Sequence, residues 1–292
     1  MLTLAQASAG PRAGRPQPSL RQQYQEYLLQ RIEGYKNSLP REELLRLGDE
    51  AATELQAASE GQFVLTEVLM RETVDRLIMK RLGLGSYSRW RKRFLKLREA
   101  QQEPTHWGIE AHHPVVTVLP RLEQDDRALV IGAGAEPLVY LLAAFDADVT
   151  FVAGSLGRVE RVETRIASES LASRFQAFVA QLGEWLPPTD DLGFVIIDAA
   201  ELAELELPQR RALLADLQAR TLPEGVHLII AGEGGVPPEG YLSHYPDWQR
   251  QSPPKAGRGS RGAAQRGLLL VAPRVRSTQA SQDVDVSIAH GS

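Results

Sequence analysis

The feature that most constrains the fold is an alternation of short aliphatic runs with amphipathic stretches after Pro104. Runs rich in β-branched and aliphatic residues, as buried strands are, occur near 128–131, 149–152, 175–179, 194–197, 226–230 and 268–271. Amphipathic segments near 137–144, 157–172 and 209–219 predict helices between them. Such alternation is typical of a mainly parallel sheet with helices on both faces, so we expect an α/β, Rossmann-like domain over residues 104–274.

Residues 19–103 follow a different pattern, because their apolar residues recur at three- and four-residue spacing. Ser19 is placed to cap a first helix and Pro40 to open a second. Gly83 or Gly85 suits the end of a third helix, and a fourth begins at Ser86 or Ser88. We therefore expect an all-α N-terminal domain that precedes the α/β domain.

Composition narrows the classes of protein that the chain could represent. With 292 residues, of which 43% are hydrophobic, it can build two modest cores, and without cysteine it has no disulfide, thiolate metal site or cysteine nucleophile. No run approaches the roughly 20 apolar residues of a membrane span. We expect a cytoplasmic protein without membrane contact, with a flexible leader over residues 1–18 and a tail over 275–292.

A glycine turn joins the first predicted strand to the first helix of the α/β domain. The turn reads Ile131-Gly-Ala-Gly-Ala-Glu136. Glycine lets the backbone turn tightly and approach a ligand, and the N-terminus of the following helix attracts polar groups. A nucleoside-type cofactor is the natural occupant of such a turn, although glycines also serve close packing between a strand and a helix.

From about His106 to Arg274 the chain resembles the class I S-adenosylmethionine-dependent methyltransferases. The likeness rests on the glycine turn, on the segment from Asp148 to Ser155 and on the strand that ends at Asp198. It implies a methyltransferase-type sheet whose last strand is antiparallel, S-adenosylmethionine as cofactor and methyl transfer to an unidentified substrate. The residues that the resemblance places at the cofactor are Gly132, Ala133, Gly134, Glu136, Ser155, Glu184 and Trp185.

Three positions depart from the family pattern. Val130 stands where the family has an acid before the glycine turn, Ala153 stands where an acid binds the ribose hydroxyls, and Glu136 replaces the third glycine. Each lost charge-assisted hydrogen bond weakens binding by about 1.5–3 kcal/mol. We therefore expect an S-adenosylmethionine-dependent methyltransferase. The alternative is a catalytically inactive methyltransferase-fold protein that serves as a binding or scaffold module and could contact nucleic acid or a protein partner. A nicotinamide-dependent oxidoreductase is disfavoured by the same missing acid and glycine.

Two segments of the α/β domain leave the roles of their acids open. Glu184 fits the position near the adenine amino group, with Trp185 as a stacking surface. A shift of the alignment would put Gln181 at that position instead. Alternatively, Glu184 is a solvated loop acid and Trp185 is a core aromatic residue. Asp198 ends a buried strand at the edge where such folds bind ligands, so it is the candidate catalytic or substrate-contacting acid. Equally, Asp198 could cap the helix that follows it.

A cluster of histidines precedes the first strand. His106, His112 and His113 could line a pocket, act as a base or bind a metal, since neutral imidazole is a good metal ligand. Adjacent histidines in an extended segment point to opposite sides, so no metal site is expected.

Two basic segments are candidates for contact with nucleic acid. The predicted fourth helix carries Arg89, Arg91, Lys92, Arg93 and Lys96, interleaved with aromatic residues and preceded by a turn, a layout loosely like a helix-turn-helix. The alternative is a solvated helix whose cations pair with acids elsewhere. A second segment, Pro253–Arg266, could bind a polyanion or simply connect strands. The substrate and the oligomeric state are left open.

Overall fold

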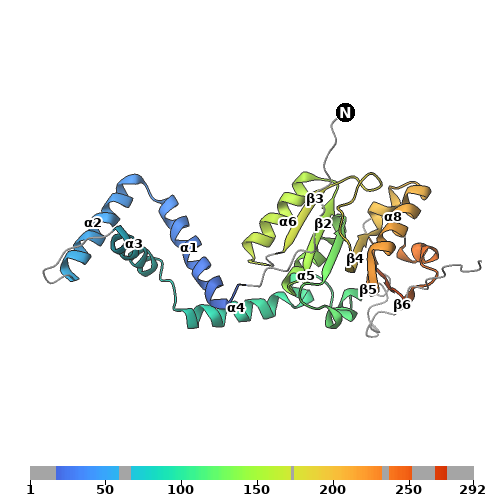
Figure 1. Cartoon of the computed structure of the whole chain (residues 1–292), viewed down its shortest axis with the longest axis horizontal. Coiled ribbons are helices and arrows are strands. Elements are labelled where there is room, and N and C mark those ends of the chain that lie inside the picture. The colour runs from blue at the N-terminus through green and yellow to red at the C-terminus, as the bar shows by residue number, and fades with distance from the viewer. Residues whose placement is uncertain (1–17, 59–66, 172–173, 232–236, 252–266, 275–292) are drawn as a thin grey trace, which may run out of the picture. The chain divides into compact units, whose positions relative to one another are not determined.

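The computed structural model describes residues 18–58, 67–171, 174–231, 237–251 and 267–274 (Figure 1). The chain divides into two compact units, residues 1–98 and residues 99–292. The predicted tail, the basic segment Pro253–Arg266 and the predicted leader apart from Pro18 lie outside the described residues.

The first unit is helical, as its spacing predicts. Helices α1 (Leu20–Ser38), α2 (Arg41–Ala58) and α3 (Glu67–Arg81) are followed by α4 (Tyr87–Gln101), which continues into the second unit. Ser19 caps α1 in a capping box, because its side chain accepts a hydrogen bond from the backbone of Gln22 and the Gln22 side chain accepts one from the backbone of Ser19. The buried core of these helices is Ile32, Leu47, Ala51, Leu77 and Ile78.

The second unit is built on a seven-stranded sheet, counted over the described residues, with the order β3-β2-β1-β4-β5-β7-β6. The strands are β1 (Arg127–Ile131), β2 (Asp148–Ala153), β3 (Phe175–Val179), β4 (Leu192–Asp198), β5 (Thr221–Ile230), β6 (Gln249–Gln251) and β7 (Gly267–Val271). The pairs β1–β2, β1–β4, β2–β3 and β4–β5 are parallel, whereas β7 is antiparallel to β5 and β6. The structure confirms the predicted antiparallel last strand.

Helices cover both faces of this sheet, because successive residues of a buried strand point to opposite sides. On one face, α5 (Glu136–Ala144) and α6 (Leu156–Ser168) pack on a cluster that includes Val130, Phe151 and Ile196. On the other face, α7 (Ala199–Ala203) and α8 (Leu207–Arg220) pack on a cluster that includes Ile131 and Ile197. This arrangement confirms the predicted α/β class and puts the carboxyl ends of β1, β2 and β4 at one edge.

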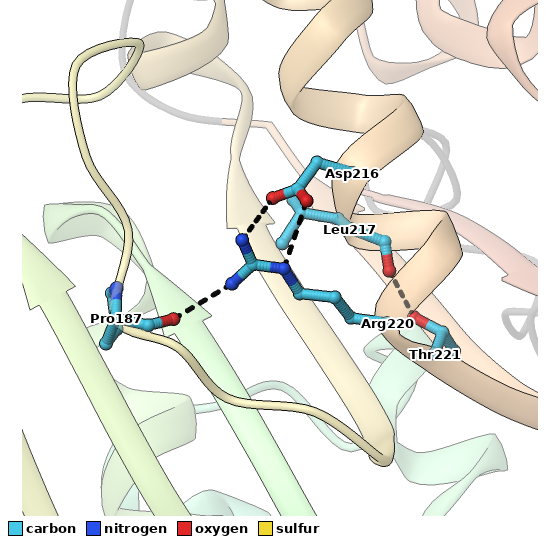
Figure 2. A network of polar contacts seen from close by, with 5 residues as sticks. All are labelled: Pro187, Asp216, Leu217, Arg220 and Thr221. Atoms are coloured by element: carbon cyan, nitrogen blue, oxygen red, sulfur yellow. Dashed lines mark hydrogen bonds and ion pairs between the residues drawn. The ribbon is translucent and has the colours of Figure 1, made fainter. Parts of the chain in front are cut away.

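The C-terminal end of α8 is tied to the loop that leads into β4 (Figure 2). The Arg220 guanidinium donates to an Asp216 carboxylate oxygen at 3.1 Å and lies 2.7 Å from the other, and it donates to the Pro187 carbonyl at 3.0 Å. The next residue, Thr221, donates its hydroxyl to the carbonyl of Leu217 at 2.7 Å. These contacts fix the loop that carries Glu184 and Trp185 at its Pro187 end.

Some elements differ from the sequence prediction. Strand β5 begins at Thr221 rather than near residue 226, and β6 was not predicted. Helix α7 is the short helix that the sequence offered as the alternative role for Asp198, its cap. Helix α6 ends at Ser168, four residues before the predicted end at 172. None of the described helices combines the length and the apolar character that crossing a bilayer requires.

Candidate functional site

The glycine turn lies between β1 and α5, at the carboxyl edge of the sheet. Gly132 has φ of 95° and ψ of 161°, a backbone conformation that residues with a side chain rarely adopt. Ala133–Ala135 then form a single 3-10 turn that leads directly into α5 at Glu136. The strand, the turn and the helix are therefore placed as the glycine spacing predicts.

Two acidic side chains occupy the space beside the turn. A Cβ atom added at Gly132 would lie 2.6 Å from Cγ of Glu201 and 2.7 Å from Cβ of Asp198. A Cβ atom added at Gly134 would lie 2.5 Å from Oδ2 of Asp198. All three distances are shorter than non-bonded carbon and oxygen atoms tolerate. The glycines are thus required by the close approach of the protein's own side chains.

The same acids accept hydrogen bonds from the amides of the turn. Oδ2 of Asp198 accepts from the N–H of Gly134 at 2.8 Å, and the Glu201 carboxylate accepts from the N–H of Ala133. Oδ1 of Asp198 accepts from the N–H of Ala200 at 2.9 Å, which makes Asp198 the N-cap of α7. Asp198 is only 4% exposed, so both of its carboxylate oxygens are committed inside the protein.

Glu201 is the acid of this site that the sequence did not reveal. Burial raises the pKa of its carboxyl, the neighbouring Glu204 and Asp198 carboxylates raise it further, and the Ala133 amide and Arg158 oppose the rise. The available signal was its spacing, since a residue three positions after the end of β4 shares a helical face with Asp198. That spacing has meaning only once the short helix α7 is known.

The departures from the family pattern lie where the sequence places them. Val130 is fully buried on the face of the sheet that α5 and α6 cover, and Ala153 is buried at the end of β2. Ser155 is exposed at the N-cap of α6, where its side chain makes no capping hydrogen bond. Neither of the two acid positions of the family is therefore filled by another acid from β1 or β2.

Glu136 is used within its own helix. Its carboxylate accepts a hydrogen bond from the hydroxyl of Tyr140 at 2.7 Å. Burial, followed by this carboxylate, raises the pKa of the Tyr140 hydroxyl well above its ordinary value. The guanidinium carbon of Arg165, on α6, lies 5.0 Å from the Tyr140 ring centre and 5.5 Å from that of Trp107, so one cation contacts both rings.

Glu184 and Trp185 lie in the turn after β3. Both are exposed, Trp185 by 48%, and the Trp185 ring packs edge-on against Phe178 at 5.8 Å. Among the described residues, no hydrogen bond or ring contact joins either of them to Gly132, Ala133 or Gly134. The structure thus brings Gly132, Gly134 and Asp198 together but does not join the predicted adenine-binding pair to them.

The three histidines before β1 have separate local contacts. His106 packs edge-on against Trp107 at 4.6 Å, and Nε2 of His112 lies 2.9 Å from a carboxylate oxygen of Glu110. Nδ1 of His113 accepts a hydrogen bond from the backbone of Val115, so this side chain caps a 3-10 helix. Within the part of the chain that the structure describes, no three His, Asp or Glu residues converge to hold a metal ion.

Two acidic side chains restrict how S-adenosylmethionine could use the glycine turn. The methionine part of the cofactor would have to take the space over Gly132 and Gly134, where the carboxylates of Asp198 and Glu201 lie. It would also find the amides of Ala133 and Gly134 already bonded. The strands meet this edge as in a cofactor-binding fold, but the protein's own Asp198 and Glu201 side chains lie beside the glycine turn.

Comparison with known proteins gives matches at the level of structure only. No family model matches the chain, and no characterised protein sequence matches it. Similar structures include a TehB-like SAM-dependent methyltransferase from Corynebacterium glutamicum (13% identity, 64% of this chain and 96% of that one, TM-score 0.44). The N-methyltransferase NodS from Bradyrhizobium japonicum in complex with S-adenosyl-L-homocysteine is another (15% identity, 61% and 97%, TM-score 0.42).

A third similar structure comes from Galdieria sulphuraria and is assigned as a sarcosine dimethylglycine methyltransferase (18% identity, TM-score 0.34). The match covers 40% of this chain and 42% of that protein, which is less than half of its length. Because the TM-scores of these matches are all below 0.5, we define the fold by the order and direction of the strands. The order β3-β2-β1-β4-β5-β7-β6, with β7 antiparallel, gives the second unit a class I methyltransferase fold.

Proposed function

We propose that this chain is a catalytically inactive binding protein built on a methyltransferase fold. The observation that carries the proposal is the glycine turn, whose amides and free space are taken by Asp198 and Glu201. An anion or a nucleoside that used this turn would have to displace the buried Asp198 carboxylate, which accepts two backbone hydrogen bonds. Breaking hydrogen bonds to a buried charged group costs about 1.5–3 kcal/mol each.

The missing acids support the same conclusion independently. Val130 and Ala153 stand at the two positions where the resembled family holds its cofactor with carboxylates, and both side chains are buried and apolar. Loss of two charge-assisted hydrogen bonds, at about 1.5–3 kcal/mol each, weakens binding by two or more orders of magnitude. A micromolar dissociation constant would then become roughly 0.1 mM or weaker from this loss alone.

The second candidate is an S-adenosylmethionine-dependent methyltransferase, and one observation favours it. The strand order and the position of the glycine turn at the carboxyl edge are those of the catalytic fold. Methyl transfer requires little beyond in-line positioning of an already activated methyl group and loss of a proton. The two candidates differ in a single measurable property, the affinity of the purified chain for the cofactor.

Isothermal titration of the full chain with S-adenosylmethionine and S-adenosylhomocysteine, with NADH as the control ligand, distinguishes them. We expect no heat of binding at about 1 mM ligand, a concentration that would saturate a micromolar site. The double variant Asp198→Ala/Glu201→Ala, which frees the amides of the turn, is titrated in parallel. Micromolar binding of either methyl-cofactor compound to the wild-type chain, without binding of NADH, would replace the proposal by the methyltransferase.

A further inference from the structure

Four cations of α4 lie on one face of the helix. Arg89, Lys92, Arg93 and Lys96 stand at positions i, i+3, i+4 and i+7, which are neighbours on a helical surface. All four are exposed. We call these four residues the basic stripe. Arg91, which is also exposed, falls outside it.

The orientation of the basic stripe within the first unit is fixed by packing on the other side of α4. The Trp90 ring lies 5.3 Å from that of Tyr24 and 6.2 Å from that of Tyr27, both on α1, and stacks on Phe94 at 4.8 Å. The Tyr24 hydroxyl donates to the carbonyl of Gly85, just before α4. With 3.6 residues per turn, the stripe is centred roughly 140° around the helix from this aromatic line. It therefore points away from α1.

The basic stripe lacks the internal partners that other cations of the same unit have. Lys36 pairs with Asp75, Arg76 with Glu54 and Arg81 with Glu50. No ion pair between described residues includes a member of the stripe, and residues 87–98 contain no acid. Moreover, Arg89 and Arg93 repel each other at i, i+4, as do Lys92 and Lys96. An anionic surface would relieve this repulsion.

We infer that the basic stripe binds the phosphate backbone of double-stranded DNA. Seven residue steps of 1.5 Å extend the stripe over about 10 Å, against one negative charge per roughly 1.7 Å of duplex axis. The major groove of B-DNA, about 12 Å wide, admits a helix, whereas that of duplex RNA is too deep and narrow. An anionic bilayer is a poorer match, because interfacial helices insert an apolar face and the aromatic face of α4 is held by α1.

The inference goes beyond the proposed function and does not depend on the state of the glycine turn. The full chain is tested by fluorescence anisotropy with a labelled random-sequence duplex over a series of salt concentrations. The variant Arg89→Gln/Lys92→Gln/Arg93→Gln/Lys96→Gln removes the stripe. The matched control, Arg31→Gln/Arg46→Gln/Arg71→Gln/Lys80→Gln, removes four exposed cations from the same unit, so the change in net charge is identical.

We expect the affinity of the stripe variant for the duplex to fall by at least about tenfold at low salt. The slope of log K against log salt concentration should become shallower by roughly 3 to 4 units, as the loss of four phosphate contacts requires. The control variant keeps its affinity within about threefold and its salt slope unchanged. Circular dichroism is used to check that each variant is folded. If the stripe variant unfolds, the double variant Arg89→Gln/Arg93→Gln replaces it, with half the expected change in slope. An equal loss in the control, no binding by the wild-type chain, or binding to phosphatidylserine vesicles or duplex RNA but not to DNA would overturn the inference.

Discussion

Oδ2 of Asp198, at the end of β4, accepts a hydrogen bond from the backbone N–H of Gly134, in the turn after β1, at 2.8 Å. The amide is one that a cofactor-binding turn offers to its ligand. In this chain a carboxylate that also caps α7 takes it. The bond therefore joins two neighbouring strands at their carboxyl ends, and the Gly134 amide stabilises the fold where a cofactor-binding turn would use it to hold a ligand.

Replacing Asp198 should destabilise the second unit. In Asp198→Ala the amides of Gly134 and Ala200 lose their acceptor together, so we expect the free energy of unfolding to fall by about 2–4 kcal/mol. Guanidinium unfolding followed by tryptophan fluorescence measures the change. The control Glu163→Ala removes an exposed carboxylate from α6 and should change stability by less than about 0.5 kcal/mol. Equal stability of the two variants would show that the Asp198 bonds contribute nothing.

A side chain at Gly132 should be poorly tolerated. Gly132→Ala forces a Cβ atom against Glu201 and Asp198 at a φ of 95°, so we expect a loss of at least about 2 kcal/mol. Gly157→Ala is the matched control, since nothing lies within 4 Å of its added Cβ and the residue is helical. That change should stabilise the protein by about 0.5 kcal/mol. Thermal unfolding of both variants tests the difference in sign.

The fold was predictable where the local pattern is strong. The strands near 128–131 and 194–197 and the helix capped by Ser19 were predicted correctly because burial, β-branching and capping act over a few residues. Strand β6 was missed because Gln249–Gln251 is short, polar and held only by pairing with β7. Tertiary pairing of that kind leaves no local signal in the sequence.

The candidate site was predictable in part. The spacing of Gly132 and Gly134 predicted the turn, and the position of Asp198 after a buried strand predicted its place at the same edge. What fills the turn could not be predicted, since the approach of Glu201 to Gly132 depends on the direction of α7 relative to β1. The roles of Glu184 and Trp185 in binding stay predictions.

The aromatic contacts that orient the basic stripe can be tested separately. Trp90→Ala removes ring contacts with Tyr24, Tyr27 and Phe94, so we expect the first unit to lose about 2–3 kcal/mol of stability. The control Leu95→Ala changes a side chain that is 44% exposed and should cost less than about 1 kcal/mol. Far-UV circular dichroism follows the helices. The fluorescence of Trp107, Trp185 and Trp248, all in the second unit, should be unchanged by Trp90→Ala.

His227, on β5, is fully buried between two hydroxyls. Its Nε2 lies 2.8 Å from Oγ1 of Thr221, and its Nδ1 lies 3.0 Å from the hydroxyl of Tyr245. Because Thr221 donates its own proton to the Leu217 carbonyl, Nε2–H of His227 donates to Thr221 and Nδ1 accepts from Tyr245. The ring is therefore neutral in the folded protein, and burial lowers its pKa to about 3.

This histidine should make the second unit less stable in acid. The unfolded chain takes up a proton at His227 below pH about 6.5, whereas the folded chain does not do so until about pH 3. Its contribution to stability is thus complete above about pH 6.5 and is lost as the pH falls towards 3. Between pH 7 and pH 5 we expect a loss of about 2 kcal/mol relative to the variant His227→Gln, which cannot titrate. Guanidinium unfolding of both proteins across this range measures the difference, and parallel pH profiles would show that His227 has the same pKa in the folded and the unfolded chain.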